Sequence, residues 1–224
     1  MKFFLLIYYF LRSVVLRGLL NTLKLLNAEK FYEKQFGIET AQFKKSNSDK
    51  FYHYQGASYL VLLKVLPEIY KQTPSFTFFD IGCGKGRAMF VAESCGYTNL
   101  IGIDLDEELI LSATNNIEKY KHKNNFNSYR VQFTFLVANA LEFNYKNEPT
   151  VYFLFNPFNA EVLKKVLEKI SALTTSETYF VYMNPKHAEV FKTVNFKLVT
   201  EFKTNKYLEA LVFKLENISK QPYK

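Results

Sequence analysis

The sequence is poor in residues that mark several protein classes, and each shortage excludes one class. The two cysteines, Cys83 and Cys95, are too few for a disulfide scaffold. No cysteine–histidine pattern has the spacing of a zinc site, so we expect no bound metal. With eight glycines and six prolines, the chain is not a collagen-like or proline-rich fibre.

Apolar residues make up 48% of the 224 residues, and the net charge is +8. That apolar share can fill a core, which excludes an intrinsically disordered chain, and the length fits one domain with or without an appendage. The charge favours an acidic partner: nucleic acid, an anionic membrane or an anionic small molecule. The absence of tryptophan beside 23 phenylalanines and 16 tyrosines also suggests codon bias in an AT-rich genome, which weakens the argument from charge.

The first 26 residues differ from the rest of the chain. They contain four basic residues (Lys2, Arg12, Arg17 and Lys24) and no acid, and the others are mostly apolar. The longest uncharged run covers nine residues, 3–11, whereas a membrane-spanning helix needs roughly 20. No small-x-small cleavage site follows this run, which argues against a secretory signal.

An amphipathic helix fits this segment better. At about 100° per residue, Lys2, Ser13, Arg17 and Lys24 fall within roughly 60° of one another, although Arg12 lies off that stripe. We expect the helix to pack on the domain or to cover its site as a lid. Peripheral contact of residues 1–26 with an anionic membrane is the second interpretation, and a signal or anchor is the third. The protein is expected in the cytoplasm, where this helix could associate with a membrane.

The chain divides into residues 1–50, the basic helix with a polar connector, and residues 51–224, a single domain. In the domain, apolar β-rich segments alternate with helical ones, and only the last two strands lack a helix between them. This order predicts an α/β fold: a doubly wound, seven-stranded, mostly parallel sheet with one antiparallel edge strand. The expected strands are Ser75–Ile81, Asn99–Leu105, Val131–Val137, Thr150–Phe155, Thr178–Met183, Phe196–Phe202 and Leu208–Leu215. The expected helices are Tyr54–Tyr70, broken near its end by Pro67, Arg87–Ser94, Glu107–Tyr120, Ala160–Leu173 and Lys186–Lys192.

A glycine-rich loop, Asp80-Ile81-Gly82-Cys83-Gly84-Lys85-Gly86, follows a strand and precedes a helix. Doubly wound sheets bind ligands at this place, where glycines let the backbone approach the ligand. A dinucleotide fingerprint is absent, because Arg87 occupies the place of its third glycine. Asp80 would also repel a pyrophosphate, and it suits a ligand that carries an ammonium group.

A second acid, Asp104, ends the next strand, 24 residues after Asp80. A carboxylate there can accept hydrogen bonds from both hydroxyls of a ribose. The two acids together describe a ligand with a cation at one end and a free ribose at the other. S-adenosylmethionine (SAM) is such a molecule.

With these motifs, the chain resembles the class I SAM-dependent methyltransferases over roughly residues 51–215. The resemblance implies the Rossmann-like methyltransferase fold and SAM as the cofactor. It places Asp80 and Gly82 at the methionine end and Asp104 at the ribose. Asn139 stands near the adenine amino group, where the family usually has an aspartate. The remaining cofactor-binding residues are Cys83, Gly84, Gly86, Leu105 and Ala140.

The fourth strand ends in Asn156-Pro157-Phe158. Relatives that methylate amino groups carry a similar motif, which implies that Asn156 and the Pro157 carbonyl orient the target nitrogen and that Phe158 walls the pocket. The alternative is a simple turn. Together with residues 36–40, the motif resembles an uncharacterised subgroup of the family. The acceptor stays open among a protein side chain, a small amine, RNA and a lipid.

Two other functions compete with methyl transfer. One is a non-catalytic SAM-binding scaffold or sensor, and the other is a dinucleotide oxidoreductase, which Arg87 and Asp80 disfavour. Several residues near the loop have an ordinary structural interpretation. We expect Cys83 to fill space, Lys85 and Arg87 to lie on the solvated surface, and residues 52–55 to pack rather than to form a lid.

Overall fold

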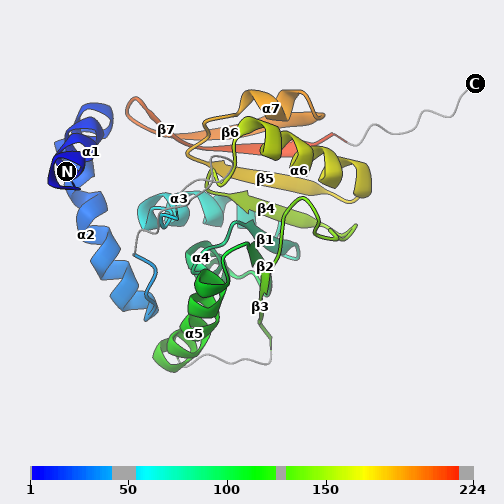
Figure 1. Ribbon diagram of the computed structural model, residues 1–224, viewed down its shortest axis with the longest axis horizontal. Helices are drawn as coiled ribbons and strands as arrows, with labels where there is room; N and C mark the ends of the chain where they lie inside the picture. The colour runs from blue at the N-terminus through cyan, green and yellow to red at the C-terminus, as the bar shows by residue number, and fades with distance from the viewer. Residues whose placement is uncertain (1, 42–53, 125–129, 217–224) are drawn as a thin grey trace, which may run out of the picture.

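A seven-stranded sheet runs through the middle of the protein, as the computed structural model shows for residues 2–41, 54–124 and 130–216 (Figure 1). Its strand order is β3-β2-β1-β4-β5-β7-β6. The strands are β1 (Thr77–Ile81), β2 (Asn99–Asp104), β3 (Gln132–Val137), β4 (Thr150–Leu154), β5 (Thr178–Met183), β6 (Phe196–Thr204) and β7 (Tyr207–Leu215).

The predicted α/β fold is confirmed. Strands β1 to β5 are parallel, and β7 runs antiparallel to both β5 and β6. The reversed strand lies one place in from the edge, because the tight turn after β6 returns the chain between β6 and β5. The outermost strand on this side is therefore β6.

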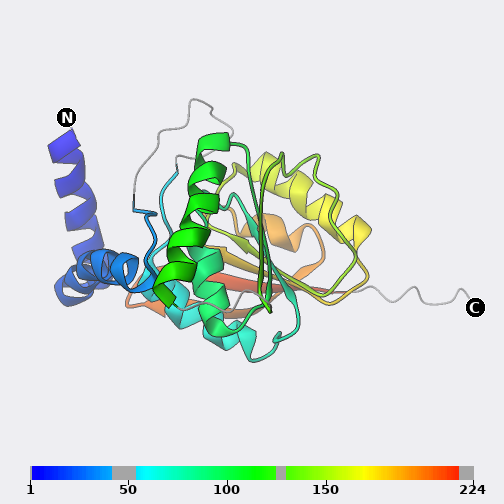
Figure 2. The same ribbon diagram turned by 90° about the horizontal axis from the view of Figure 1, so that it is seen from below.

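Helices cover both faces of the sheet (Figure 2). One face packs against α3 (Tyr59–Tyr70), α4 (Arg87–Cys95) and α5 (Glu107–Asn124), and the other against α6 (Ala160–Leu173) and α7 (Glu189–Lys192). Successive strand residues serve opposite cores, as Phe78 and Phe79 do on β1. The two apolar cores explain why the central strands read as continuous apolar runs rather than as alternating ones.

Two sequence-based expectations about helices are wrong. Pro67 lies inside α3 instead of ending it, because the fully buried Val65 and Leu66 and the nearly buried Ile69 hold the helix on both sides of the proline. The N-terminal helix is split at Gly18 into α1 (Lys2–Arg17) and α2 (Leu19–Phe36). Gly18 has φ 88°, a conformation that glycine adopts at little cost. The predicted polar stripe from Lys2 to Lys24 therefore does not lie on one helix.

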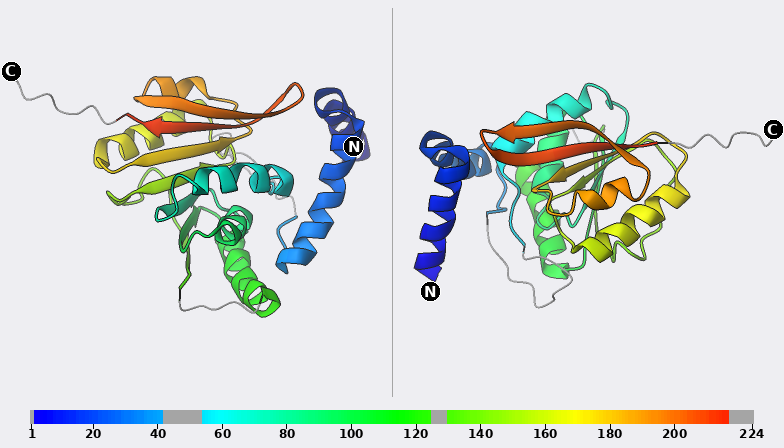
Figure 3. Two further views of the ribbon diagram at one scale, coloured as in Figure 1. Left: turned by 180° about the vertical axis from the view of Figure 1, so that it is seen from behind. Right: turned by 90° about the horizontal axis from the view of Figure 1, so that it is seen from above.

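The helices α1 and α2 stand at one end of the sheet (Figure 3). Within the described residues, no helix is both long and apolar enough to cross a membrane. Residues 36–40, which follow α2, belong to the packed structure, since Phe36 and Ile38 lie in the same core as α3 and α4. The predicted connector, 42–50, lies outside the described residues.

Candidate functional site

The glycine loop lies between the carboxyl end of β1 and the first residue of α4. Gly82 and Gly84 have φ of 78° and 53°, in the region that other residues rarely adopt. A Cβ on Gly82 would lie 2.8 Å from Pro157 Cβ, and a Cβ on Gly84 would lie 2.1 Å from Tyr54 Cε2. The glycines therefore let the end of β4 and the Tyr54 ring pack directly on the loop backbone.

Asp80 and Asp104 meet beside this loop, at the carboxyl ends of adjacent parallel strands. Asp80 is only 3% exposed, and burial raises the pKa of its carboxyl well above the ordinary 3.8, with the charge of Asp104 adding to the shift. Burial also raises the pKa of Asp104, which is opposed by hydrogen bonds from the backbone. A buried acid whose ionisation is further disfavoured by a second acid makes this edge receptive to a cation.

The Asp104 carboxylate ties the loop to β2. Its Oδ2 accepts a hydrogen bond from Gly84 N at 2.9 Å, and its Oδ1 accepts one from Asp106 N at 3.0 Å. A carboxylate has about four lone-pair positions, so both oxygens can accept further bonds, as a ribose diol would require. The neighbouring Leu105 is 47% exposed.

Cys83 has the structural role that the sequence predicts for its side chain. It is buried against Gly102, whose Cβ would lie 2.9 Å from Cys83 Sγ. Burial raises the pKa of the thiol well above its ordinary value, and the nearby charges of Asp80 and Asp104 raise it further. A thiol held protonated in this way is a poor nucleophile, so only the backbone of Cys83 is suited to a ligand.

The residues after β3 form a capped turn. Asn139 Oδ1 accepts from Leu141 N at 3.0 Å, and its Nδ2 donates to Glu142 Oε1 at 3.1 Å. Ala140 is buried, and its carbonyl accepts from the Tyr145 hydroxyl at 2.9 Å. The role of Asn139 beside an adenine stays a prediction, because both ends of its amide already have protein partners.

At the end of β4, Asn156 is 4% exposed and has φ 48°. Its Oδ1 accepts a hydrogen bond from the Tyr182 hydroxyl at 2.7 Å and keeps a second lone pair. Pro157 lies on Gly82, and Phe158 is buried in the core beneath α6. The motif is thus joined to the glycine loop, and Tyr182, which the sequence analysis did not single out, fixes its amide.

Neither Lys85 nor Arg87 is a solvated surface residue as expected: Lys85 is 7% exposed, and the side chain of Arg87 is 4% exposed. Nη1 pairs with Glu29 Oε2 at 2.8 Å, and Nη2 pairs with Glu33 Oε1 at 3.3 Å. The guanidinium also donates to Thr40 Oγ1 at 2.6 Å and to the Ala57 carbonyl at 2.7 Å. Arg87, the first residue of α4, therefore anchors α2. The sequence hints at this role only through the spacing of Glu29 and Glu33, which are four residues apart.

Asn116 and Tyr54 complete this attachment. Asn116 Oδ1 accepts from Glu39 N at 3.1 Å, and its Nδ2 donates to the Lys85 carbonyl at 3.2 Å. The Tyr54 hydroxyl donates to the Thr40 carbonyl at 2.8 Å, while its ring covers Gly84. Residues 39–40 are thereby tied to the glycine loop. Of the other residues predicted to pack, Gln55 is instead exposed, and Tyr52 and His53 lie outside the described residues.

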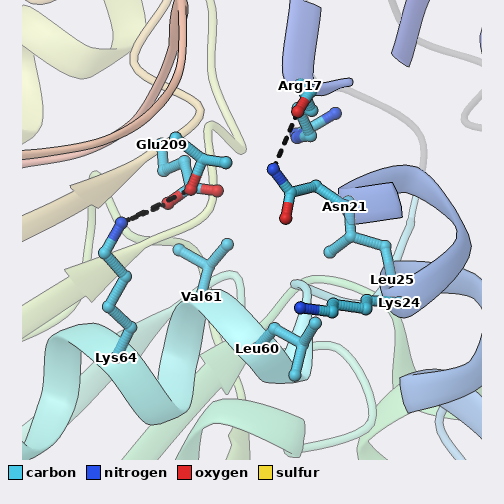
Figure 4. A pocket seen from close by; sticks show the side chains of 9 residues that line it. Arg17, Asn21, Lys24, Leu25, Leu60, Val61, Lys64 and Glu209 are labelled. Carbon is cyan, nitrogen blue, oxygen red and sulfur yellow. Dashed lines mark hydrogen bonds and ion pairs between the residues drawn. The ribbon is translucent and has the colours of Figure 1, made fainter. Parts of the chain in front are cut away.

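A separate pocket of about 110 Å³ lies between α1, α2, α3 and the strands β6 and β7 (Figure 4). It shares no residue with the glycine loop, and its lining includes three cations: Arg17, Lys24 and Lys64. In the part of the chain that the structure describes, no group of three or more histidine, cysteine, aspartate or glutamate residues could hold a metal ion.

Comparisons with known proteins identify both the domain and its fold. A family model described as a methyltransferase domain matches residues 72–222. The PH0226 protein of Pyrococcus horikoshii OT3 is 15% identical, with a TM-score of 0.53 over 83% of this chain and 99% of that chain. Magnesium protoporphyrin IX methyltransferase from Synechocystis PCC 6803, solved with bound S-adenosylhomocysteine, is 14% identical, with a TM-score of 0.52 over 70% and 82% of the two chains. The same enzyme with bound SAM has a TM-score of 0.51 at 14% identity, over 69% and 77%.

At such identities, the likeness to solved structures establishes the fold alone. No curated protein sequence matches the chain at a significant level.

Proposed function

The chain belongs to the methyltransferase domain family, and on this premise we propose that it transfers a methyl group from SAM to a nitrogen of a protein side chain or small amine. The observation that carries the proposal is the pair of carboxyl groups, Asp80 buried and Asp104 partly buried, beside a glycine loop in which Gly82 is exposed. Bound SAM and S-adenosylhomocysteine in the structural neighbour support this choice of cofactor.

The residues of the loop edge fit the chemistry of SAM. Asp80 would offset the positive charge of the methionine end. Burial disfavours the ionised form of this carboxyl, and a cation beside it would stabilise that form. Asp104 would accept hydrogen bonds from the ribose hydroxyls through its remaining lone pairs. Asn139, Leu105 and Ala140 follow the ends of β3 and β2, where the adenine would lie. When bound, SAM supplies a methyl group on a positively charged sulfur, open to in-line displacement.

The chain's own part in the reaction is to orient the acceptor. The free lone pair of Asn156 Oδ1 and the Pro157 carbonyl would accept hydrogen bonds from the acceptor nitrogen and direct its lone pair toward the methyl group. Tyr182 holds the Asn156 amide in place, and Phe158 keeps water from the path. Orientation of this kind can supply roughly 7–11 kcal/mol of a barrier.

The test is incubation of the full chain with tritiated-methyl SAM and cell extract, followed by sorting of the label into protein, small-molecule, RNA and lipid fractions. We expect labelled protein or amine and release of S-adenosylhomocysteine. Asn156→Ala should keep SAM binding and lose turnover. Asn156→Gly should do the same without the strain that φ 48° imposes on alanine.

The chain offers a matched control. Asn184 also precedes a proline at the end of a strand, has φ 49°, and accepts a hydrogen bond from a tyrosine, Tyr207, at 3.1 Å. Asn184→Ala should therefore share any folding cost and keep turnover. Equal turnover in the Asn156 variants and the wild type would refute the role of Asn156. SAM binding without any released S-adenosylhomocysteine would favour the non-catalytic scaffold.

A further inference from the structure

The helices α1 and α2, residues 2–36, form an arm that meets the rest of the protein along one side of α2 and, at the end of α1, through Arg17 (Figure 3). Among the side chains of α1 that the structure describes, those of residues 7, 8 and 10–17, none is buried. Over these described positions, α1 therefore has an apolar surface that the domain does not cover.

Exposed apolar side chains are concentrated on this arm. Among the residues whose exposure the structure describes, sixteen large hydrophobic ones are exposed, and nine of these belong to the arm: Ile7, Tyr8, Leu11, Val15, Leu19, Leu20, Leu23, Leu26 and Phe31. Val15 and Leu20 are 78% and 74% exposed. At about 100° per residue, the four on α1 fall within an arc of roughly 100°, so they form one stripe. Contiguous exposed apolar surface of this kind marks an interaction site.

The charges on the outer side of the arm have one sign. Its two acids, Glu29 and Glu33, both pair with the buried Arg87 and so face the domain. The exposed charged residues of the arm are all basic, namely Arg12, Lys24, Lys30 and Lys34. The arm thus presents apolar and cationic side chains together, which is the composition of helices that lie in the interface of an anionic membrane.

The charged side chains that line the pocket beside the arm are also mainly positive. Arg17, Lys24 and Lys64 line it, and its acid, Glu209, is paired with Lys64 at 3.0 Å (Figure 4). Arg17 stacks over the Tyr207 ring at 3.5 Å, and its buried Nε has no hydrogen-bond partner among the described residues. Basic side chains beside an apolar helix attract the phosphate groups of anionic lipids.

We propose that the arm is a docking surface for an anionic phospholipid membrane. The apolar stripe of α1 enters the boundary between headgroups and acyl chains, and the basic side chains of both helices contact lipid phosphates. A membrane suits the surface better than a second copy of the chain, because two facing arms would bring their cations together while an anionic bilayer neutralises them. This docking is independent of the proposed methyl transfer.

The test is flotation of the full-length protein with vesicles of phosphatidylcholine alone or mixed with phosphatidylglycerol. We expect binding to the mixed vesicles that weakens as salt rises, and little binding to the neutral ones. The double variant Val15→Glu/Leu20→Glu should bind at least about tenfold more weakly, because it places two acids on the apolar, cationic face. Leu111→Glu, at a 61% exposed position on α5, is the matched control and should bind like the wild type.

Thermal melting of each variant checks its fold, and we expect no change, because both arm substitutions lie at exposed positions. Light scattering in solution measures the oligomeric state, and so tests whether a second copy of the chain covers the arm instead of a membrane. Equal binding of the double variant and the wild type to the mixed vesicles would overturn the proposal, as would the lack of preference for anionic lipid. A dimer that the double variant converts to a monomer would overturn it in favour of a second copy of this chain.

Discussion

The helices α1 and α2 are built from similar residues, apolar and basic, yet the domain holds α2 along its length and α1 only at its last residue, Arg17. α2 buries Thr22, Ala28 and Phe36, and its acids pair with Arg87. α1 contacts α2, and through Arg17 it reaches the β6–β7 turn, where Asn205 Nδ2 donates to the Arg17 carbonyl at 2.6 Å. Similar apolar content therefore does not make both helices pack on the domain. The ion pairs of Glu29 and Glu33 with the buried Arg87 distinguish α2 from α1.

The two ends of the arm also differ in what they contact. The anchored end of the arm continues through Thr40 and Asn116 to the glycine loop. The other end, α1, is left with an exposed apolar surface. One part of the arm therefore supports the cofactor edge of the sheet, and the other is available to a partner.

Removing the anchor should produce the largest effect. Arg87→Ala leaves Glu29 and Glu33 without their cation near the core, so we expect a loss of about 3 kcal/mol in unfolding free energy. Arg12→Ala, on the exposed side of α1, should change it by less than about 0.5 kcal/mol. Denaturant unfolding of both variants measures the contrast, and equal losses would show that Arg87 does not anchor α2.

A second comparison uses two glycines: Gly84, in the loop to which the arm is tied, and Gly18, which separates α1 from α2. Gly84→Ala meets a positive φ and a Tyr54 ring at 2.1 Å, whereas Gly18→Ala meets a positive φ and only an ordinary contact at 3.4 Å. We expect each substitution to cost about 1–3 kcal/mol through its backbone conformation, and Gly18, with ψ 155°, lies in a region that is almost restricted to glycine. Gly84→Ala should lose about 1 kcal/mol beyond its own backbone cost, by analogy with overpacking elsewhere, and Tyr54→Ala should recover that excess. No recovery in the double variant would contradict the close packing of Tyr54 on the loop.

The pH dependence of SAM binding should come from the cofactor edge and not from the exposed face of the arm. Because the pKa of Asp80 is raised in the folded chain, this carboxyl binds a proton at a pH above its ordinary 3.8. A bound cation favours the ionised form, so SAM affinity should be full above the raised pKa and fall as pH falls through it, by at most about tenfold per pH unit for this group. Calorimetry across pH tests this. Asp80→Asn should flatten the profile, and Val15→Glu/Leu20→Glu should leave it unchanged; a flat profile for the wild type would be evidence against the role of Asp80.

The smallest effect is expected on α1 itself. Val15→Ser replaces a side chain that is 78% exposed and should alter unfolding free energy by less than about 0.5 kcal/mol. Val65→Ser, at a fully buried position on α3, should cost about 2 kcal/mol or more. If Val15→Ser were as costly as Val65→Ser, α1 would have to be packed in solution.

The strands and the glycine loop could be predicted because their signals are local. The apolar run before Asp80 and the glycines after it lie within ten residues, and α6 and β5 have the predicted bounds. The environment of Arg87 could not be predicted, because its partners Glu29 and Glu33 lie more than fifty residues away and their pairing depends on the fold of α2. Likewise, the packing of Tyr54 on Gly84 and of Pro157 on Gly82 depends on which loops meet at one edge of the sheet.

Pro67 and Gly18 show how local preference and packing compete. The buried neighbours of Pro67 outweigh its tendency to end a helix, whereas no comparable core surrounds Gly18, and the helix breaks there. For the candidate site, the acids and glycines could be named from the sequence, but the hydrogen bond from Tyr182 on β5 to Asn156, just after β4, needed the structure.

The central claim, that the edge between β1 and β2 binds SAM through its two acids, is tested most directly by calorimetric titration of SAM into the wild type, Asp104→Asn and Glu118→Gln. Glu118 is an exposed acid on α5, with a side chain 79% exposed, and serves as the charge-matched control. We predict one SAM per chain for the wild type and the control, and at least about tenfold weaker binding for Asp104→Asn, which loses charge-assisted hydrogen bonds. No binding by the wild type, or equal affinity in all three proteins, would contradict the claim.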